Sequence, residues 1–533
     1  MNPIRYHLET KHHFNRLARS LGYLDWANQP EPFRFYKEAE IIKLPLDLPD
    51  PDCPYEALYE TNLCKEKEFS LENISKFLEL ALGLSAWKSI PGSQWALRMN
   101  PSSGNLHPTE AYLIIPHLNG IEGIFHYNPY LHALEKRASL PEKISNQIKD
   151  FFGVECFFIA LTSIPWREAW KYGERALRYC LLDTGHAIGS VRFSASLQGW
   201  KVKYLNALSD KDIEKILGFH KTTWIENEEE FVEGLFCVFP QFKKDISRTI
   251  PEDIINEIST LDFKGKPNRL SKEHVRWEII YETLKRIEKP RTNEEKINLP
   301  EKPILWLKKP SLKAPAIIKK RRSAQAYDRK TYIDLDTFVH ILDKTIPRKD
   351  ISPFDVEIIQ PSINLLLFVH RVSGLKQGLY FFFRDETFKE DLIKRTRRNF
   401  LWKKIREDAE LYLLYEGNVE QTARIVSCHQ DIASDSSFSL GMISLFEPVI
   451  KEKPWLYRNI HWEAGLIGQV LYLEAEAQGI RGTGIGCFFD DAVHEILGFQ
   501  DLKYQTIYHF TVGGFLEDFR LKSYPPYYHL KNI

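Results

Sequence analysis

The two halves of the chain repeat each other at a constant spacing of 280 positions. The register holds without a gap from residue 185 to residue 219, which chance does not produce easily. The matched positions are Gly185 and Gly465, Ala195 and Ala475, Gln198 and Gln478, Gly199 and Gly479, Asp210 and Asp490, and Leu217-Gly218-Phe219 and Leu497-Gly498-Phe499. The repeat, in a chain of 533 residues that is too long for one core, predicts two homologous domains in tandem.

Each domain is expected to be α+β, because short apolar runs alternate with long helical patterns. Ser70 is a good N-cap for a helix with an apolar stripe, and Asp334 is the expected N-cap of a helix in the second half. The predicted strands cover 123–127, 157–162 and 231–239, and the predicted central helices cover about 168–199 and 461–478.

Composition shifts divide the chain into four parts. We expect an N-terminal arm at 1–60, a first domain at 61–240, a connector at 241–315 and a second domain at 316–533. The connector is predicted to contain a helix at 272–287 and, after it, an extended proline-rich segment that lies on the protein surface.

Charge and cysteine usage exclude several functions. Basic and acidic residues number 72 each, which does not favour nucleic acid or an anionic membrane as a partner, and no apolar run approaches the roughly 20 residues of a membrane span. The seven cysteines form no CxxC pair, and His7, His12 and His13 lack the spacing of metal ligands. We therefore expect a cytoplasmic protein without metal or a disulfide scaffold.

The segment Pro101–Asn105 precedes an apolar strand at 111–115. Ser102, Ser103 and Asn105 supply hydroxyl and amide groups, and Gly104 allows the backbone to approach a ligand closely. Such loops are often only turns, so this pattern by itself fits a turn as well as a ligand contact.

Two further segments lie in the second half. Arg321, Arg322 and Ser323 precede a helix and could hold a phosphate, although a basic run alone is more often a solvated face. The run 482–486 follows a helix instead of a strand, so it is not a dinucleotide fingerprint. Its glycines would let backbone N–H groups face a ligand.

Together, the PSSGN loop, the RRS segment and the late glycines resemble the nitroreductase-like flavoproteins, and more narrowly their SagB-type (thiazoline/oxazoline) dehydrogenase branch. The resemblance implies two nitroreductase-like domains, each with a central mixed or antiparallel sheet flanked by helices, forming an intrachain pseudo-dimer. It implies FMN at the interface of the two domains.

The resemblance carries over residue by residue to one composite site. The implied cofactor-binding residues are Arg321, Arg322 and Ser323 at the phosphate and ribityl chain, Ser102, Ser103, Gly104 and Asn105 at the isoalloxazine, Gly484, Ile485 and Gly486 at the flavin N5, and Arg520 as a final phosphate-binding cation. Lys171 and Tyr172 resemble a catalytic Lys-Tyr pair of azoline oxidases. The alternative is that Lys171 and Arg175 form ion pairs with Glu168 and Glu174 on a solvated helix face. His186 is expected to be a hydrogen-bonded core histidine.

Each half of the chain lacks a cofactor-binding segment that the other half retains. At the 280 spacing, 482–486 corresponds to 202–206, which has no glycine, and the second half has Gln360–Asn364 without the loop glycine. One retained FMN site is therefore expected; two sites are disfavoured, and a pseudoenzyme with none is an alternative.

The expected function is FMN-dependent dehydrogenation of a heterocycle or a peptide-derived substrate, with hydride transfer to flavin N5. The alternatives are an NAD(P)H-dependent nitro or quinone reductase and a non-catalytic flavin- or peptide-binding protein. Expected partners are a small-molecule or peptide-derived substrate, with NAD(P)H or O₂ as redox partner, and the pseudo-dimer could act as a monomer.

Overall fold

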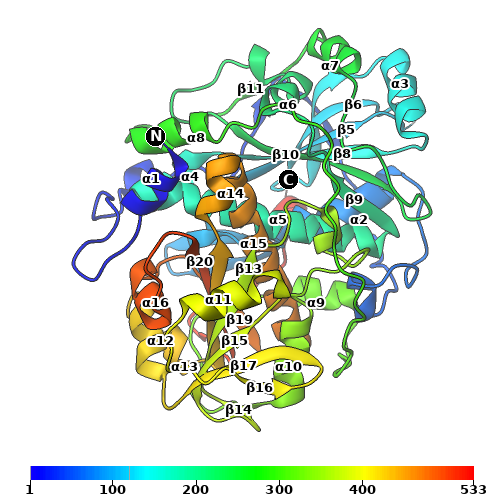
Figure 1. The fold of residues 1–533 in the computed structure, drawn as a ribbon. Coiled ribbons are helices and arrows are strands. Elements are labelled where there is room, and N and C mark those ends of the chain that lie inside the picture. The colour runs from blue at the N-terminus through cyan, green and yellow to red at the C-terminus, as the bar shows by residue number, and fades with distance from the viewer. Residues whose placement is uncertain (1, 119, 533) are drawn as a thin grey trace.

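The computed structural model describes residues 2–118 and 120–532, and each half of the chain contains one seven-stranded antiparallel sheet (Figure 1). The first sheet runs in the order β2 (Glu40–Lys43), β7 (Ala133–Ser139), β6 (Gly123–Asn128), β5 (Thr109–Ile115), β8 (Phe157–Ser163), β10 (Phe231–Pro240), β9 (Trp200–Tyr204). The second runs β16 (Lys403–Arg406), β17 (Ala409–Glu416), β15 (Gly378–Phe382), β13 (Ile363–Val369), β18 (Phe438–Leu445), β20 (Tyr504–Gly513), β19 (Arg481–Ile485).

The two sheets share one topology. From β7 to β9 and from β17 to β19, strands follow each other across the sheet in the same order and with the same antiparallel pairing. The central strands β5, β8 and β13 are buried along their whole length, which explains their continuous apolar sequences. The chain therefore has the predicted fold, two tandem α+β domains.

The central helices α5 (Ala176–Leu197) and α15 (Leu456–Ala477) pack against each other between the two sheets (Figure 1). They cross at the repeated glycines: a Cβ on Gly185 would lie 2.3 Å from the Trp462 carbonyl oxygen, and a Cβ on Gly465 would lie 2.3 Å from the Leu182 carbonyl oxygen. Each contact is the other displaced by 280 positions, so the domains meet as the halves of a symmetric dimer do.

The remaining helices surround this core. Two of them begin as their sequences predict: the Ser70 hydroxyl accepts the N–H of Asn73 at 3.2 Å ahead of α2 (Leu71–Leu82), and the Asp334 carboxylate accepts the N–H of Thr337 at 2.7 Å ahead of α10 (Leu335–Asp343). The others are α1 (Pro3–Glu9), α3 (Glu142–Phe152), α4 (Pro165–Tyr172), α6 (Asp210–Leu217), α7 (Glu252–Ser259), α8 (Glu278–Arg286), α9 (Ala314–Lys320), α11 (Lys389–Arg395), α12 (Glu420–Val426), α13 (Asp431–Asp435), α14 (Glu447–Glu452) and α16 (Asp490–Leu497).

The helix predicted over about 168–199 is two helices. Gly173 has φ +56° between α4 and α5, and a Cβ there would lie 2.2 Å from the Arg19 carbonyl oxygen. That carbonyl accepts the Glu174 N–H at 2.9 Å, so the N-terminal arm docks where the helix breaks. The connector helix is also shorter than predicted, because α8 begins only at Glu278.

Short strands join distant parts of the chain. β2 belongs to the predicted N-terminal arm, yet it forms the edge of the first sheet by pairing with β7. β21 (Lys522–Tyr524), near the C-terminus, pairs with β3 (Leu84–Ile90) of the first domain, which itself forms a hairpin with β4 (Ser93–Arg98). Two-stranded pairs also form between β1 (Tyr36–Lys37) and β11 (Lys266–Pro267), and between β12 (Ile333–Asp334) and β14 (Val372–Ser373).

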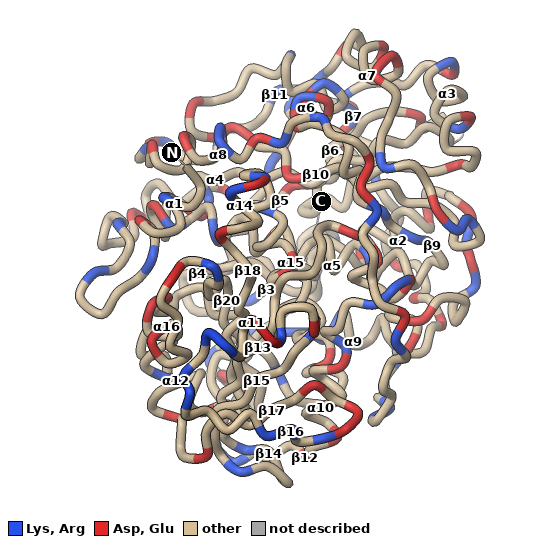
Figure 2. Tube along the Cα trace, viewed as in Figure 1, with Lys and Arg blue, Asp and Glu red and all other residues tan. Residues whose placement is uncertain are grey.

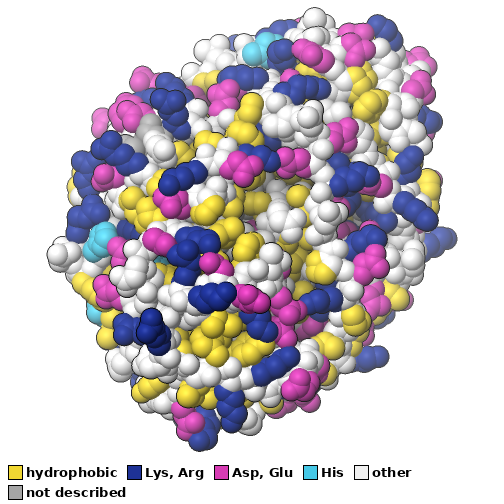
Figure 3. Space-filling view, in the orientation of Figure 1, with side chains coloured by type: hydrophobic (Ala, Val, Ile, Leu, Met, Phe, Trp, Pro, Cys, Tyr) yellow, Lys and Arg dark blue, Asp and Glu magenta, His cyan; other side chains and the backbone are white. Residues whose placement is uncertain are grey.

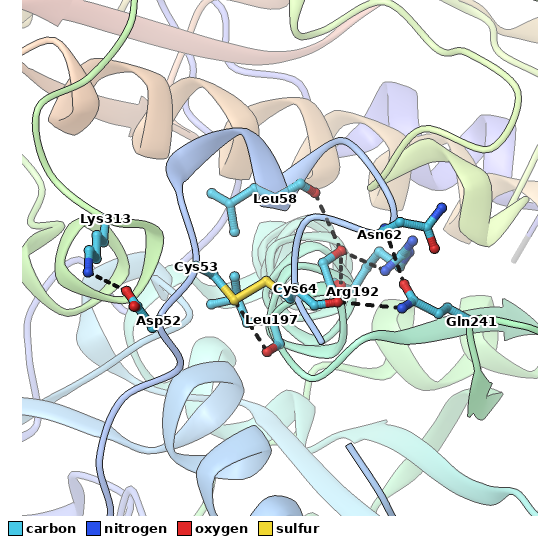
Figure 4. The surroundings of a disulfide bond; sticks show 10 residues. Asp52, Cys53, Leu58, Asn62, Cys64, Arg192, Leu197, Gln241 and Lys313 are labelled. Atoms are coloured by element: carbon cyan, nitrogen blue, oxygen red, sulfur yellow. Dashed lines mark hydrogen bonds and ion pairs between the residues drawn. A yellow bond between two sulfur atoms is a disulfide. The ribbon is translucent and has the colours of Figure 1, made fainter. Parts of the chain in front are cut away.

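Cys53 and Cys64 form a disulfide bond near the C-terminal end of α5 (Figure 4). This one disulfide departs from the expectation of a chain without a disulfide scaffold. A short 3₁₀ turn, Tyr55–Leu58, folds the intervening segment back so that the two Cα atoms lie 5.5 Å apart, a separation that a disulfide can span. The cysteines at 156, 180, 237, 428 and 487 are free.

Charged side chains of both signs are interspersed along the chain and over the face seen in Figure 3 (Figures 2 and 3). This distribution agrees with the equal numbers of basic and acidic residues. Across residues 2–118 and 120–532, every helix is too short or too polar to cross a bilayer.

Candidate functional site

A cavity of about 860 Å³ lies between the two domains. The first domain contributes the loop Ser102–Asn105 and one face of α5, and the second contributes Arg321–Ser323 together with residues of α15, β19 and β20. The hairpin of β3 and β4 and the segment 516–523 complete its wall, and Phe519, which is 97% exposed, lies on the open side. Both domains are needed to form this cavity.

The loop Ser102–Asn105 is held by hydrogen bonds at both ends. The Ser102 hydroxyl accepts the N–H of His107 at 2.8 Å, and the Asn105 side-chain amide donates to the Ala96 carbonyl at 2.8 Å. Gly104 and Asn105 both have φ +59°, a conformation that Gly and Asn tolerate better than other residues. The small polar residues of the motif therefore fix the backbone of the loop.

Arg321 and Arg322 carry positive charge into the opposite wall. Their guanidinium groups donate only to backbone carbonyls, those of Arg98, Lys319, Arg321 and Ser85, and neither forms an ion pair within the described chain. Burial, together with the neighbouring Arg321, lowers the pKa of Arg322 to about 10. Glu476 and Glu517 are close enough to act on these charges but form no ion pair with them, so two adjacent guanidinium groups stay available to an anion.

Of the three residues predicted at the flavin N5, Gly484 lines the cavity and the other two do not. It lies in edge strand β19, its N–H donates to the Tyr472 hydroxyl at 3.0 Å, and a Cβ there would lie 1.8 Å from the Tyr508 hydroxyl oxygen. Ile485 packs in the core of the second domain, and Gly486 lies against the ring of Tyr179. The structure thus places Ile485 and Gly486 away from the cavity.

The other predicted residues divide similarly. Ser323 lines the cavity and its hydroxyl is 3.0 Å from the Tyr472 hydroxyl. Arg520 does not line the cavity; its exposed guanidinium pairs with Asp518 at 2.7 Å. Its neighbours Asp518, Phe519 and Leu521 do line it.

Lys171 and Tyr172 contact the loop at Gly104, although they do not line the cavity. A Cβ on Gly104 would lie 2.7 Å from the Tyr172 hydroxyl and 3.0 Å from Lys171 Nζ. Burial raises the pKa of Tyr172, so its hydroxyl keeps its proton at neutral pH. The expected ion pairs of this helix face do not form as predicted, because Glu174 pairs with Arg19 and Arg175 with Asp490.

His186 is the buried, hydrogen-bonded histidine that the sequence predicts, and it also lines the cavity. Its ring nitrogens lie 3.4 Å from the Gln469 side-chain oxygen and 3.3 Å from the Tyr508 hydroxyl. Burial lowers the pKa of His186 to about 3, so the ring is neutral.

Several lining residues were missed by the sequence analysis: Asp183, Tyr472, Arg481, Thr483 and Tyr508. Asp183, Tyr472 and Tyr508 come from helices and a strand of ordinary composition, so no local motif identifies them. Arg481 and Thr483 lie at the glycine run 482–486, where only the backbone was expected to face a ligand. For Asp183 a signal exists in the repeat, because an acidic residue, Glu463, lies 280 positions later.

A second, smaller cavity of about 230 Å³ lies at the place that the 280-residue repeat relates to the first cavity, and we call it the pseudo-equivalent cavity. Tyr204 occupies the position that corresponds to Gly484, and it lines this cavity with Gln360–Ser362. The connector enters it as well, with Lys289 donating from Nζ to the Leu208 carbonyl at 3.0 Å. Side chains therefore fill much of the volume that is open in the first cavity.

Residues 64–237 match the model of the Nitroreductase family. A protein of Methanocaldococcus jannaschii that is provisionally named a nitroreductase is 27% identical over 125 residues, which are 22% of this chain and 62% of that protein. A crystal structure from Anabaena variabilis, also provisionally a nitroreductase, is 22% identical with a TM-score of 0.69 and covers 96% of this chain and 99% of its own.

The Anabaena structure shows that both halves of this chain share the nitroreductase fold. A chain of the Escherichia coli microcin synthetase McbBCD complex matches 34% of this chain and 67% of its own at 20% identity, with a TM-score of 0.26 that supports no conclusion.

Proposed function

We propose that this chain, whose residues 64–237 match the nitroreductase family, is an FMN-dependent oxidoreductase with one composite site between its domains. The observation that carries the proposal is the position of Arg321 and Arg322, which form no ion pair in the described chain and face the Ser102–Asn105 loop across one cavity. A flat, polar-edged ligand with a phosphate fits that arrangement.

The residues present fit FMN. Arg321, Arg322 and Ser323 would hold the phosphate and ribityl chain, since guanidinium groups bind phosphate through charge-assisted hydrogen bonds. Ser102, Ser103 and Gly104 would lie along the ring system, with the Gly484 backbone on the other domain. The volume of about 860 Å³ is in the upper part of the range for ligand sites.

When bound, FMN would supply a two-electron acceptor for dehydrogenation of a heterocycle or a peptide-derived substrate, the reaction of the SagB-type branch that the PSSGN and RRS segments resemble. The open side at Leu516 and Phe519 offers apolar surface to such a substrate. Lys171 and Tyr172 stay proposed catalytic residues, and they would act from their contact with Gly104. O₂ is the proposed acceptor of the electrons in this reaction, and NAD(P)H would be the electron donor in the alternative, a nitro or quinone reductase.

One FMN per chain is proposed because the pseudo-equivalent cavity is narrowed by Tyr204 and by the connector. It also lacks an arginine pair like that of Arg321 and Arg322 among its described lining residues.

The direct test is to titrate the full chain with FMN and follow the quenching of flavin fluorescence. Saturable binding and a yellow protein after removal of free flavin are expected. A colourless protein that does not bind added FMN would exclude the proposal. If NAD(P)H bleached the bound flavin rapidly, a nitro or quinone reductase would become the better assignment.

Asn105→Ala is expected to weaken FMN binding about tenfold. The substitution removes the hydrogen bond to Ala96 and places alanine at φ +59°, which together cost on the order of 1–2 kcal/mol of loop order. The comparison is the FMN dissociation constant of Asn227→Ala, which also replaces an Asn of positive φ (+68°) but lies away from the cavity. If Asn105→Ala and Asn227→Ala bound FMN with equal affinity, the loop would not be part of the FMN site.

A further inference from the structure

A buried carboxyl group, that of Asp183 on α5, lies in the cavity wall behind the Ser102–Asn105 loop. It accepts two hydrogen bonds from Ser103, one from the backbone N–H and one from the hydroxyl, both at 3.1 Å. Asp183 is only 2% exposed. The carboxyl group therefore ties the loop to the central helix.

The second half of the chain repeats this construction with one difference. Glu463, 280 positions after Asp183, accepts the N–H of Ser362 at 3.0 Å and its hydroxyl at 3.1 Å. Its other oxygen accepts Arg384 Nη1 at 2.7 Å, so the buried charge is neutralised. A carboxyl group can thus anchor a loop serine while it is paired with an arginine, as Glu463 is. Asp183 anchors its serine without an arginine partner.

The groups that act on Asp183 include no cation. Burial raises the pKa of Asp183 to about 7, and the hydrogen bonds from Ser102 and Ser103 oppose that rise only in part. Burial, together with Asp183, raises the pKa of Glu168 and Tyr172 from α4, Cys180 from α5 and Tyr508 from β20, all neutral in their protonated forms. His186 of α5 lines the same cavity as a neutral ring, and Lys171 of α4 contacts the same loop at Gly104.

Glu168 is a second buried carboxyl group close to Asp183. It is fully buried on α4, and no donor in the described chain reaches either of its carboxyl oxygens. Burial and the nearby Asp183 raise the pKa of Glu168 well above its usual value. Of the two carboxyl groups, Asp183 is therefore the one that ionises first, and it is the one that lines the cavity.

We propose that Asp183 exchanges a proton with the molecule that is oxidised in the cavity. This inference rests on the proposed function, in which dehydrogenation removes two hydrogens from the substrate. One hydrogen leaves with both electrons for the flavin as oxidant, and the other leaves as a proton. The Asp183 carboxylate accepts that proton, becomes a carboxylic acid, and returns it to water before the next turnover.

Infrared spectroscopy of the flavin-free full chain tests the protonation state directly. With ¹³C-labelled aspartate, the C=O band of a protonated aspartic acid is separated from that of Glu168. We expect such a band at pH 6 that disappears with a midpoint near 7, in the wild type and in Asp408→Asn, a surface control with the same chemical change. The band is expected to be missing in Asp183→Asn.

Ser103→Ala keeps the Asp183 carboxyl group and provides a second test that does not depend on the folding of Asp183→Asn. It removes one hydrogen bond to the ionised form, and the midpoint is expected to rise by about one pH unit. A midpoint that is unchanged in Ser103→Ala, or a band that persists in Asp183→Asn, would overturn the assignment.

Proton uptake on reduction of the FMN-loaded chain, measured with a pH-indicator dye, tests the role in the reaction. The number of protons taken up per flavin is expected to change near pH 7 in the wild type. This change is expected to be missing in Asp183→Asn. Equal profiles in the two proteins would refute the proton role while leaving FMN binding intact. Failure to bind FMN, with the infrared titration present, would instead refute the proposed function.

Discussion

The substitution Gly465→Ala is expected to destabilise the chain by about 3 kcal/mol or more. The added Cβ would lie 2.3 Å from the Leu182 carbonyl oxygen and 2.7 Å from the Cα of Gly185. Both are backbone atoms of the opposing helix, so no side chain can rotate away and α5 and α15 must move apart. Urea unfolding monitored by circular dichroism measures the loss.

Gly189→Ala is the matched control, because it adds the same methyl group on α5 near the same crossing. There the nearest atoms to the Cβ would be Cγ and Cβ of Gln469, at 2.9 and 3.0 Å, and Cδ2 of Leu466, at 3.4 Å, all of them side-chain atoms. The loss of unfolding free energy is therefore expected to be clearly smaller than in Gly465→Ala, helped by the higher helix propensity of alanine. If both variants unfolded at the same urea concentration, the close crossing of the central helices would be incorrect.

Arg322→Ala is expected to weaken FMN binding by roughly 10- to 100-fold. A hydrogen bond to a charged group contributes about 1.5–3 kcal/mol, and the guanidinium of Arg322 has only carbonyl partners in the protein. Arg321→Ala should act in the same direction, and the affinity of the wild type should fall as salt is raised. Fluorescence titration with FMN gives the dissociation constants.

Arg406→Ala serves as the control for removing a positive charge, because Arg406 is paired with Asp336 and Asp408 on the surface of the second domain. We expect no change in its FMN affinity. Should Arg322→Ala bind FMN as tightly as Arg406→Ala, the phosphate would have to lie elsewhere in the cavity.

The sequence predicts the two-domain fold well because the features that determine it are local or repeated. Apolar runs identify β6, β8 and β10, and caps identify the starts of α2 and α10. The repeat of Gly185 and Gly465 reflects a physical need, since only glycine lets the two helices approach so closely.

Features that depend on distant parts of the chain could not be predicted. The break at Gly173 exists because Arg19 docks there, and β21 has no pattern of its own until it pairs with β3. The disulfide depends on the turn that brings Cys53 to Cys64, and spacing in sequence does not give that distance.

The same distinction holds for the site. The segments Ser102–Asn105 and Arg321–Ser323 are singled out because together they resemble the motifs of one family, and the fold brings them to one cavity. A match to a family motif does not determine which residues of the matched segment line the cavity. The structure places Ile485, Gly486 and Arg520 outside it. Asp183 is an ordinary helical residue in sequence, and its importance appears only from its burial without a cation.

The ratio of bound FMN to chain tests the central claim most directly. The full chain is saturated with FMN, freed of unbound flavin, and measured for flavin absorbance and protein concentration. One shared site predicts one FMN per chain in the wild type and a lower ratio in Arg322→Ala under the same conditions. A ratio of two would mean that the cavity around Tyr204 also binds flavin, and a ratio of zero would mean that the shared cavity serves another ligand.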